Sequence, residues 1–544
     1  MPIEKGAADN LIITGFMGTG KSAVGRMVAQ RLGRPYIDLD AEIEAQAGKS
    51  IQRVFAEEGE SHFRALESAL LREVLQHGNH VIATGGGTLV DADNRASIPE
   101  ADVVICLHAE PEAILHRVRG DQSRPLLQVE DPGFEISRLL EMRGEAYASL
   151  PWHIDTTELS LDEVVRRVLA LARARVLPVC HPGGTYRVRI GRGMRHHVGG
   201  ALRAAGTPAG TSIALVSNDV VAPLYIAQVQ RSLSTAHLRP FSCIIPDGED
   251  HKTLDTVASL YNQFLGGGLD RSGLVLSLGG GVTGDIAGFA ASSFMRGVPF
   301  AQVPTTLLAM VDAGVGGKTG VDLPQGKNLV GAFKQPVVVA VDPEVLSTLA
   351  AQEVRSGMAE VIKHGIIGAP DLFVQLEAAA PEPASEVPLG VPLTSEQLAS
   401  ALRVKIDIVE EDPYERGQRA VLNLGHTVGH ALETLSSFQL RHGEAVSIGI
   451  VTAARISVAL GHADSRMAER IESVLASWGL PVRCVGPQLG PFPADRIWQA
   501  TAHDKKRRQG AARWVLPRAI GDVTVREDVP QNVVLSVLRE QGAL

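Results

Sequence analysis

Two histidines stand four residues apart in the stretch NLGHTVGHALE, residues 423–433. Side chains at positions i and i+4 of a helix share one face, so His426 and His430 could hold a metal ion, act as a catalytic pair, or be ordinary helical residues. A zinc protease would carry Glu directly after the first histidine, but Thr427 stands there. The pair alone does not decide between these interpretations.

Further potential metal ligands occur in GMAEVIKHG (357–365) and RHGEAVSIG (441–449). A glutamate and two histidines from separate segments, with one coordination position open, are typical of a catalytic zinc site. Glu360, one histidine of the pair and His442 could form such a set. His364 follows Glu360 by four residues, so spacing alone also admits it as a rival ligand. Any single histidine is more often a capped or solvated side chain.

A phosphate-binding loop is indicated by GFMGTGKS, residues 15–22, which matches G-x4-G-K-S between an apolar strand and an amphipathic helix. The backbone N–H groups of such a loop face phosphate, a lysine reaches the outer phosphates, and a serine can hold Mg²⁺. The sequence therefore predicts an ATP and Mg²⁺ site at Gly15, Gly18, Thr19, Gly20, Lys21 and Ser22.

A second glycine-rich loop, GGGVTG (279–284), follows the apolar stretch GLVLSL. It satisfies G-x-G-x-x-G, but an ordinary dinucleotide fold has an acidic residue about 20 positions further on. Here that region reads AQVPTTLLA and has no acid. The loop is therefore either a chance turn or part of a nucleotide site of different design.

Composition limits the function classes. The net charge of −9 over 544 residues is mild. It argues against a general nucleic-acid binder, and anionic substrates would need local Arg and Lys clusters. The four cysteines form no CxxC pair, which fits a reducing cytoplasm. The N-terminus lacks the apolar core of a signal peptide, and the most apolar stretch, 273–295, contains Asp285. We therefore expect a cytoplasmic protein that does not enter a membrane.

The elements that must position these groups are of two kinds. Alternating apolar strands and amphipathic helices up to about residue 172 predict a parallel sheet covered by helices. A second α/β section follows, and helical periodicity dominates from about 346, with a Pro-rich exposed loop at 378–394. The predicted α/β organisation is a P-loop kinase domain (1–172), a linker (173–184), a Rossmann-like lobe (185–345) and a mainly α-helical metal-binding lobe (346–544).

Several motifs follow the phosphate loop in a fixed order: DLD (38–40), FR ending at Arg64, TGGGT (84–88), RPLL beginning at Arg124, and RGEAY (143–147). With them, residues 10–170 resemble shikimate kinase. Adenylate and gluconate kinases share the loop but not this order. The resemblance implies that Asp40 orients and deprotonates the acceptor hydroxyl, and two guanidinium groups suit the substrate's carboxylate.

The kinase residues implied by this resemblance fall into three groups. The catalytic residues are Lys21, Asp40 and Arg124. The further ATP and Mg²⁺ residues are Asp38, Arg117 and Arg124. The shikimate-binding residues are Asp40, Arg64, Gly85, Gly86, Gly87 and Arg143.

The later motifs DGEDHK (247–252), GGGVTGD, PTT, DAGVGGKTGVD (312–322), GKN, GMAEVIK and the two histidine segments also follow in a family order. Through them, residues 185–544 resemble 3-dehydroquinate synthase. The resemblance implies NAD on the Rossmann-like lobe, a metal ion on the helical lobe and the substrate between. It implies that Glu360, His426 and His442 are the metal ligands, for zinc or cobalt, and that His430 acts on the substrate in proton transfer or binding.

The remaining synthase residues implied by the resemblance also form groups. The catalytic residues are Lys318, Lys363 and His430. The NAD-binding residues are Asn218, Asp247, Glu249, Lys252, Gly281, Val282, Thr283, Gly284, Asp285, Thr305, Thr306, Lys318 and Lys327. The residues for heptulosonate phosphate are Arg296, Asp312, Lys318, Asn328, Lys363, Lys405, Arg419, Asn423, His430 and Lys505, with Lys506 as the alternative to Lys505.

The two resemblances together imply a bifunctional enzyme. One half would phosphorylate the 3-hydroxyl of shikimate with ATP. The other, a homodimer-forming half, would convert 3-deoxy-D-arabino-heptulosonate 7-phosphate to 3-dehydroquinate and phosphate. A polyol dehydrogenase would not need Lys318, Lys363 and Lys405, whereas a cyclase for another sugar phosphate would share this chemistry. A non-enzymatic nucleotide-binding platform would not need the complete set of mechanistic residues.

Overall fold

The computed structural model describes residues 10–99, 102–119, 129, 131–379, 393–415, 417–484, 492–507 and 513–544, with side chains described except at 502–507. By compactness the chain divides into two units. The first contains Met1–Val176, Gly191–Ile213 and Ala227–Phe241, and the second contains Leu177–Ile190, Ala214–Ile226 and Ser242–Leu544.

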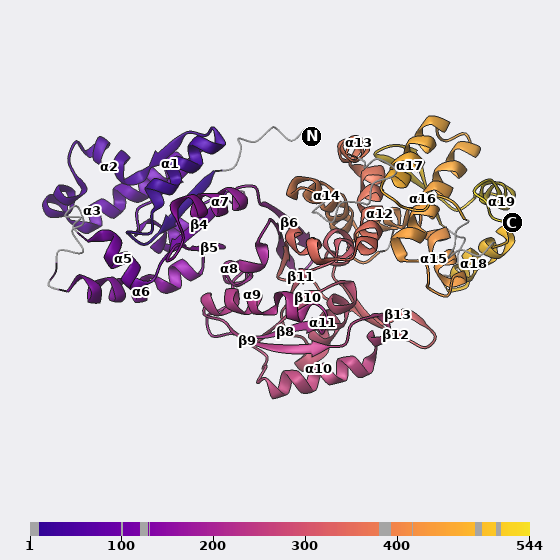
Figure 1. The fold of residues 1–544 in the computed structure, drawn as a ribbon, viewed down its shortest axis with the longest axis horizontal. Coiled ribbons are helices and arrows are strands. Elements are labelled where there is room, and N and C mark those ends of the chain that lie inside the picture. The colour runs from indigo at the N-terminus through magenta and orange to yellow at the C-terminus, as the bar shows by residue number, and fades with distance from the viewer. Residues whose placement is uncertain are drawn as a thin grey trace. The chain divides into compact units, whose positions relative to one another are not determined.

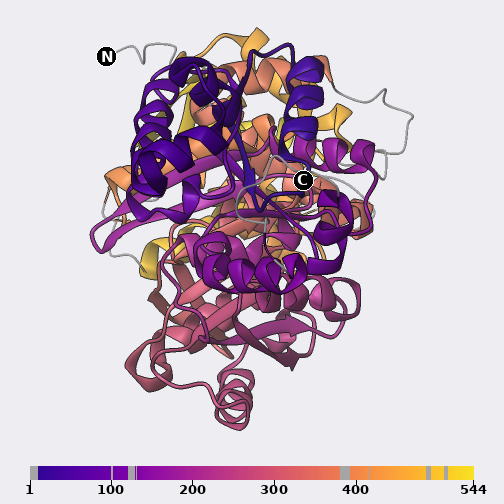
Figure 2. The same ribbon diagram turned by 90° about the vertical axis from the view of Figure 1, so that its left-hand side faces the viewer.

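The first unit contains a five-stranded sheet in the order β2-β3-β1-β4-β5. Its strands all pair in parallel. The central strand is buried along its whole length and is apolar except at Thr14, because both faces of such a sheet are covered by helices. Figures 1 and 2 show these helices around the sheet in the indigo and purple part of the ribbon. The strands are β1 (Leu11–Gly15), β2 (Tyr36–Asp38), β3 (Val81–Ala83), β4 (Val103–His108) and β5 (Trp152–Asp155).

Two of the helices around this sheet, α1 and α2, end at a glycine in the left-handed conformation. Gly33 adopts a φ of +64° and its N–H donates to the carbonyls of Ala29 and Gln30, which ends α1. These elements are α1 (Lys21–Leu32), α2 (Leu39–Ala47), α3 (Ile51–Val74), η1 (Thr88–Val90), α4 (Ala92–Ala96), α5 (Pro111–Val118), α6 (Pro132–Ala148) and α7 (Leu161–Leu171). The predicted parallel sheet with helices is confirmed.

A seven-stranded sheet follows in the order β6-β7-β14-β11-β10-β8-β9. The predicted linker 173–184 contains its edge strand, β6, and an edge strand tolerates the exposed Pro178 because no further strand needs its N–H. The strands are β6 (Arg175–His181), β7 (Gly184–Ile190), β8 (Ser212–Asn218), β9 (Arg239–Ile245), β10 (Leu274–Gly279), β11 (Phe300–Pro304) and β14 (Val338–Val341).

Helices and one hairpin accompany this sheet, as Figure 1 shows in magenta. The hairpin pairs β12 with β13 in antiparallel register. The elements are η3 (Met194–His196), α8 (Val198–Ala204), α9 (Ala222–Thr235), η4 (Glu249–His251), α10 (Leu254–Gly266), α11 (Gly281–Ser293), η5 (Phe294–Arg296), η6 (Ala309–Ala313), β12 (Lys318–Leu323), β13 (Gly326–Phe333) and η7 (Pro343–Thr348).

The chain after residue 346 is mainly helical, as predicted, around the almost wholly buried helix α16. It also contains a β-hairpin, β15–β16, that periodicity did not indicate. The elements are α12 (Ala351–Gly368), α13 (Pro370–Ala378), α14 (Ser395–Glu411), η8 (Gln418–Asn423), α15 (His426–Leu435), α16 (His442–Ala459), α17 (Ser465–Ser477), α18 (Ala494–Arg507), β15 (Trp514–Ala519), β16 (Asp522–Arg526) and α19 (Gln531–Glu540). Most of the Pro-rich stretch 378–394 lies outside the described residues.

Among the described helices, none combines the length and the apolar character needed to cross a membrane.

Candidate functional site

The phosphate loop lies between β1 and the N-terminus of α1. Gly15 has a φ of +131°, and a Cβ there would lie 2.0 Å from the carbonyl oxygen of Leu107, so only glycine fits. The Thr19 hydroxyl donates to the carbonyl of Phe16 at 2.7 Å, and Lys21 Nζ donates to the same oxygen at 3.1 Å. The loop is therefore held in shape at the end of a helix where backbone N–H groups favour an anion.

The residues predicted to bind shikimate come together around the end of β3. A Cβ on Gly85 would lie 2.8 Å from Asp40 Oδ1, and one on Gly87 would lie 2.3 Å from Arg64 Nη1. Arg143 Nη1 donates to the carbonyl of Gly86 at 3.3 Å. The three glycines thus leave room for a carboxylate and two guanidinium groups around one short turn.

Glu67 is a residue of this site that sequence reasoning missed. It is buried, its Oε2 pairs with Arg64 Nη1 at 2.7 Å, and its Oε1 accepts a hydrogen bond from the Thr88 hydroxyl at 2.5 Å. A buried carboxylate must be paired, and here the pairing orients Arg64. The available signal was the i, i+3 spacing of Arg64 and Glu67 on one helix.

The predicted ATP-side residues contact different parts of the domain. Asp38 Oδ2 accepts a hydrogen bond from Tyr36 at 3.0 Å, and burial together with Asp38 raises the pKa of Tyr36 to about 12. Arg117 donates to Thr156 Oγ1 at 2.9 Å and to the carbonyl of Thr157 at 3.1 Å, so its guanidinium is held against that segment. Arg124 lies outside the described residues.

The predicted metal ligands converge from three helices. Glu360 is fully buried on α12, His426 begins α15 and His442 begins α16. The Nε2 atoms of His426 and His442 lie 3.9 and 3.6 Å from Glu360 Oε1. One ligand atom from each of the three residues falls within 4.8 Å of the other two.

Close helix packing brings these ligands together. A Cβ on Gly443 would lie 1.9 Å from the carbonyl oxygen of Ser356, and a Cβ on Gly449 would lie 1.9 Å from that of Gly425. The absence of side chains at these two positions lets α16 approach α12 near Ser356, one turn before Glu360, and approach the start of α15. The neighbour of Gly443, His442, is thereby brought to Glu360.

The tautomers of both histidines suit metal binding. His426 Nδ1 lies 3.1 Å from the carbonyl oxygen of Leu424, and His442 Nδ1 lies 3.0 Å from Glu433 Oε1. A carbonyl or a carboxylate can only accept, so each Nδ1 carries the proton. Whenever the ring is neutral, the lone pair of Nε2 therefore faces the side where Glu360 lies.

The charges of the site are those of a centre prepared for a cation. The Glu360 oxygens accept no hydrogen bond of standard geometry among the described residues, although the Lys363 ammonium is in ion-pair contact with Oε2. Burial raises the pKa of Glu360, but Lys363 and the two histidines lower it well below its usual range. Burial and Lys363 lower the pKa of His426. The donor set, one carboxylate and two neutral imidazole nitrogens, fits a divalent metal ion.

The surroundings of His442 favour a positive charge at this position. Burial lowers the pKa of His442, but the nearby carboxylates of Glu360 and Glu433 outweigh burial and raise that pKa to about 10. A cation bound at Nε2 of His442 would replace the proton on that nitrogen and would lie beside Glu360.

His364, the rival ligand by spacing, lies one turn after Glu360 on α12. It is fully buried, and neither ring nitrogen has a hydrogen-bond partner among the described residues. With Asp312 and Glu360 it forms a second close group. Asp312 is already paired with Lys405 Nζ at 2.6 Å, so this group has less free ligand capacity than the Glu360, His426 and His442 set.

Cationic side chains surround this centre as predicted for an anionic substrate. Lys363, Lys405 and Arg419 are buried, and Lys318 pairs with Glu415 at 2.6 Å. Asn423 ends η8, and His430 is exposed with its ring centroid 5.2 Å from that of His426.

Three other residues predicted for the substrate, Arg296, Lys505 and Lys506, are not among the side chains that the structure shows in this group. Arg296 is exposed in η5 and makes no ion pair or hydrogen bond with the described members of this group. The backbone of Lys505 and Lys506 lies in α18, but their side chains are outside the description.

The dinucleotide-side residues form small clusters near the end of β10. Gly281 begins α11, and Thr305 N–H donates to the carbonyl of Gly279 at 2.9 Å, which joins the loop to the end of β11. The pairs are Lys252 with Asp285 at 2.6 Å, Lys252 with Asn328 at 2.7 Å, Asn218 with Asp247 at 2.5 Å, and Lys327 with Glu249 at 3.2 Å. Asn328, predicted for the substrate, thus contacts a predicted NAD residue.

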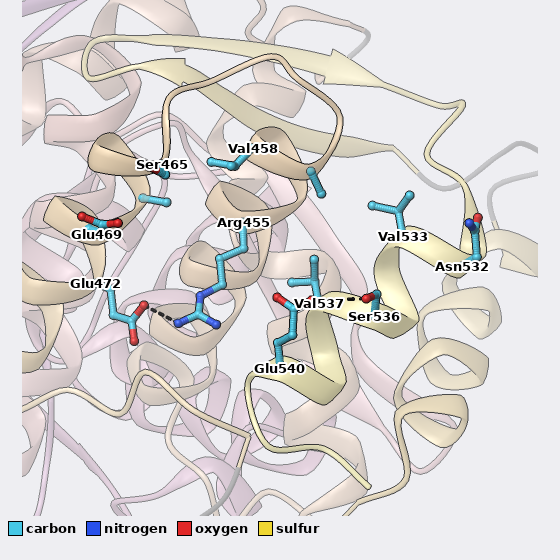
Figure 3. Close-up of a pocket in the computed structure, with 12 residues that line it drawn as sticks. Arg455, Val458, Ser465, Glu469, Glu472, Asn532, Val533, Ser536, Val537 and Glu540 are labelled. Carbon is cyan, nitrogen blue, oxygen red and sulfur yellow. Dashed lines mark hydrogen bonds and ion pairs between the residues drawn. The ribbon is translucent and has the colours of Figure 1, made fainter.

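A cavity of about 590 Å³ lies elsewhere, between α16, α17 and α19 (Figure 3). Arg455 pairs there with Glu472 at 2.6 Å, and Ser536 donates to Glu540 at 3.2 Å. None of the predicted site residues lines this cavity. The candidate chemistry is therefore in the two clusters described above.

Comparisons with known proteins assign the kinase residues and the metal-centre residues to different families. Residues 17–173 match the family model of shikimate kinase, 242–356 that of the 3-dehydroquinate synthase N-terminal domain, and 357–507 that of its C-terminal domain. The chain is 42% identical to the 3-dehydroquinate synthase of a Synechococcus species over 368 residues, 67% of this chain and 98% of that protein.

Two solved structures are also similar. One is the 2-epi-5-epi-valiolone synthase of Streptomyces hygroscopicus with NAD⁺ and Zn²⁺ bound, with 28% identity, 65% of this chain and 96% of that chain covered, and a TM-score of 0.56. The other is the shikimate kinase of Acinetobacter baumannii in complex with shikimate, with 36% identity, 30% of this chain and 92% of that chain covered, and a TM-score of 0.29. Both resemblances inferred from the motifs are confirmed, and the chain belongs to the 3-dehydroquinate synthase family and carries a shikimate kinase domain in front of it.

Proposed function

We propose that Glu360, His426 and His442 bind one divalent metal ion, zinc or cobalt, that serves the conversion of 3-deoxy-D-arabino-heptulosonate 7-phosphate to 3-dehydroquinate. The observation that carries this proposal is the buried Glu360 carboxylate, which accepts no regular hydrogen bond and faces two Nε2 atoms. A related synthase of known structure holds NAD⁺ and Zn²⁺, which supports the proposal.

A bound divalent cation supplies Lewis acidity for a substrate hydroxyl, and bound NAD⁺ supplies reversible hydride transfer. The chain's own residues do the remaining work. Three buried cationic side chains bind the carboxylate and phosphate of the substrate: Lys363, Lys405 and Arg419. His430 is exposed near His426, where it can move a proton at the substrate phosphate.

The NAD⁺ site is proposed at the loop between β10 and α11. The N-terminus of α11, beginning at Gly281, favours the pyrophosphate. Glu249 or Asp247 is proposed to accept hydrogen bonds from the ribose, which compensates for the missing acid after β11. Lys252, with Asp285 and Asn328, holds the neighbouring wall of this site.

For the kinase half we propose that the loop with Lys21 and Ser22 binds ATP and Mg²⁺. Arg64 and Arg143 are proposed to hold the shikimate carboxylate, and Asp40 to take the proton of its 3-hydroxyl. The support is their convergence around Gly85–Gly87. Phosphoryl transfer depends mainly on positioning and charge neutralisation, which such an arrangement can provide.

We propose that the chain works in the cytoplasm, on small molecules rather than on nucleic acid or membranes, and as a homodimer through the synthase half. Its four cysteines are free, which fits a reducing compartment. The proposed functional divisions remain 1–172, 185–345 and 346–544. The mass of the purified protein in solution tests the dimer.

The proposed synthase site is tested by phosphate release from the heptulosonate phosphate with NAD⁺ and metal each withheld. Release that requires both, without net NADH, is the expected result. Retention of bound zinc by H442A and E360Q would show that the ligands are elsewhere. Accumulating NADH without phosphate release would show dehydrogenase chemistry instead.

A further inference from the structure

We infer that Glu433 is a positioning residue of the metal centre, whose carboxylate fixes the His442 imidazole with Nε2 directed at Glu360. This inference rests on the metal set proposed above. Glu433 is the last letter of the NLGHTVGHALE stretch, yet spacing from the histidines gave it no role. His442 comes close to Glu433 only because the chain reverses direction between α15 and α16.

The geometry assigns the role through the second nitrogen of the ring. Glu433 Oε1 lies 3.0 Å from His442 Nδ1, and the carboxylate is half-buried at the end of α15. A histidine ligand that donates its other N–H to a carboxylate has both its tautomer and its orientation fixed, and it becomes a more basic ligand. His426 has a weaker partner, the neutral carbonyl of Leu424 at 3.1 Å. The two ligands are therefore supported unequally.

The backbone at Glu433 is held by two hydrogen bonds to its carbonyl oxygen. The N–H of Phe438 donates to the Glu433 carbonyl at 2.8 Å, and the Ser436 hydroxyl donates to the same oxygen at 3.0 Å. Ser437 and Phe438 both have positive φ, +53° and +60°, in the short turn that reverses the chain toward α16. This turn fixes the distance between the end of α15 and His442.

A second reading of the same atoms is a separate ion site, because one ligand atom each from His430, Glu433 and His442 also falls within 4.8 Å of the others. An ion there would have to displace the proton from His442 Nδ1 and break its bond with Glu433. The Glu360 carboxylate, by contrast, is fully buried and accepts no regular hydrogen bond. The ion is therefore assigned to Nε2 of His442, and Glu433 is assigned to Nδ1 on the opposite edge of the ring.

The test compares three variants of the full-length protein. E433A removes the acceptor, and E433Q keeps a neutral oxygen acceptor of the same shape. E377A is the control: it removes a carboxylate of the same lobe that pairs with Arg470 at 2.7 Å and is not one of the residues of the metal centre. Zinc affinity is measured by competition with a chromogenic chelator, and the ligand field by the visible spectrum of the Co²⁺-substituted protein.

We expect E433A to weaken zinc binding about 10- to 100-fold and to shift the Co²⁺ bands. E433Q should recover most of the Co²⁺ spectrum and part of the affinity, because its amide oxygen still accepts from Nδ1. E377A should change neither. If E433A does not fold, E433Q against the parent protein gives the same comparison, with a smaller loss of affinity.

Unchanged zinc affinity and unchanged Co²⁺ bands in E433A would overturn the inference, and so would unchanged zinc affinity in E433Q if E433A does not fold. Loss of one of two bound zinc ions, with the other unaffected, would also overturn it and indicate a separate ion site. H442A that retains full zinc would instead refute the proposed ligand set, so the two failures are distinguishable.

Discussion

The proposed shikimate site of the kinase half and the proposed metal centre of the synthase half each contain a buried charge, but the partners of that charge lie at different sequence distances. Arg64 is oriented by Glu67, three residues away on the same helix. Glu360 meets His426 and His442, which come from two other helices. The kinase cluster depends on local helix geometry and on glycines that leave space, whereas the metal centre depends on how tightly three helices pack.

The largest expected effect is on the metal centre. E360Q removes the charge of the proposed carboxylate ligand, and the loss of several kcal/mol of Lewis-acid stabilisation corresponds to a fall of about 10³-fold or more in phosphate release. Shikimate phosphorylation by the same protein should stay within about twofold if the two sites are independent. Assays of both activities on one preparation decide this, and a parallel loss of both would break the comparison.

The reciprocal variant tests the kinase. K21M removes the ammonium that holds the loop at Phe16 and that we propose to contact phosphate, and about 10³-fold of kinase turnover should be lost because charge neutralisation dominates phosphoryl transfer. Phosphate release by the synthase half should be unaffected. A coupled ADP assay measures the first activity. Kinase turnover within tenfold of the parent protein would exclude the proposed role of Lys21.

A glycine substitution tests the space that the kinase cluster needs. G87A places a Cβ 2.3 Å from the present position of Arg64 Nη1, so the guanidinium must move. A misplacement of about 1 Å can cost roughly 100-fold, and here we expect it mainly as a raised KM for shikimate. G33A, where a Cβ meets nothing but the φ is +64°, is a matched control that should lower stability and leave KM unchanged. An unchanged KM in G87A would show that Arg64 does not contact the substrate.

A smaller effect is expected from E67Q. The amide keeps the bond from Thr88 but loses the ion pair with Arg64, so KM for shikimate should rise by about 10-fold, the worth of roughly 1.4 kcal/mol of orientation. E60Q, which removes an exposed partner of Arg64 at 3.1 Å, should change KM little because exposed pairs contribute little. Equal effects of the two variants would contradict the role of burial.

The smallest effect concerns stability and pH in the first unit. Burial lowers the pKa of His153 to about 4 and that of His197 to about 3, with neighbouring histidines adding to the shift. Both folded-state pKa values lie below the unfolded value of about 6.5, so the unfolded chain binds more protons as pH falls below 6.5. Stability is therefore full above about pH 6.5 and is lost progressively toward pH 3–4.

Thermal unfolding measured at pH 7 and pH 5 checks this expectation. Each histidine costs up to about 1.4 kcal/mol per pH unit below the unfolded pKa, so the melting temperature should fall by several degrees. H197N should flatten the dependence. A melting temperature that does not change between pH 7 and pH 5 would show that these rings are not buried as neutral groups.

Sequence reasoning reached the contiguous parts of both sites. The phosphate loop, the glycines 85–87 and the histidine segments are short strings in which residue type and backbone conformation are tied together. It did not reach Glu67 or Glu433, because a glutamate in an amphipathic helix carries no local mark of what it faces. It also missed the β15–β16 hairpin, whose stability depends on packing against α12 and α16.

What the amino-acid sequence alone determined is the class of chemistry, since a glycine loop with Lys21 and Ser22, and a glutamate with two histidines, restrict the ligands that can bind. It also determined the alternation of strands and helices. The tertiary structure decided which carboxylate orients which cation and which nitrogen of His442 is turned toward Glu360. Those choices depend on close approaches such as Gly443 against Ser356, which are set by packing between segments far apart in the chain.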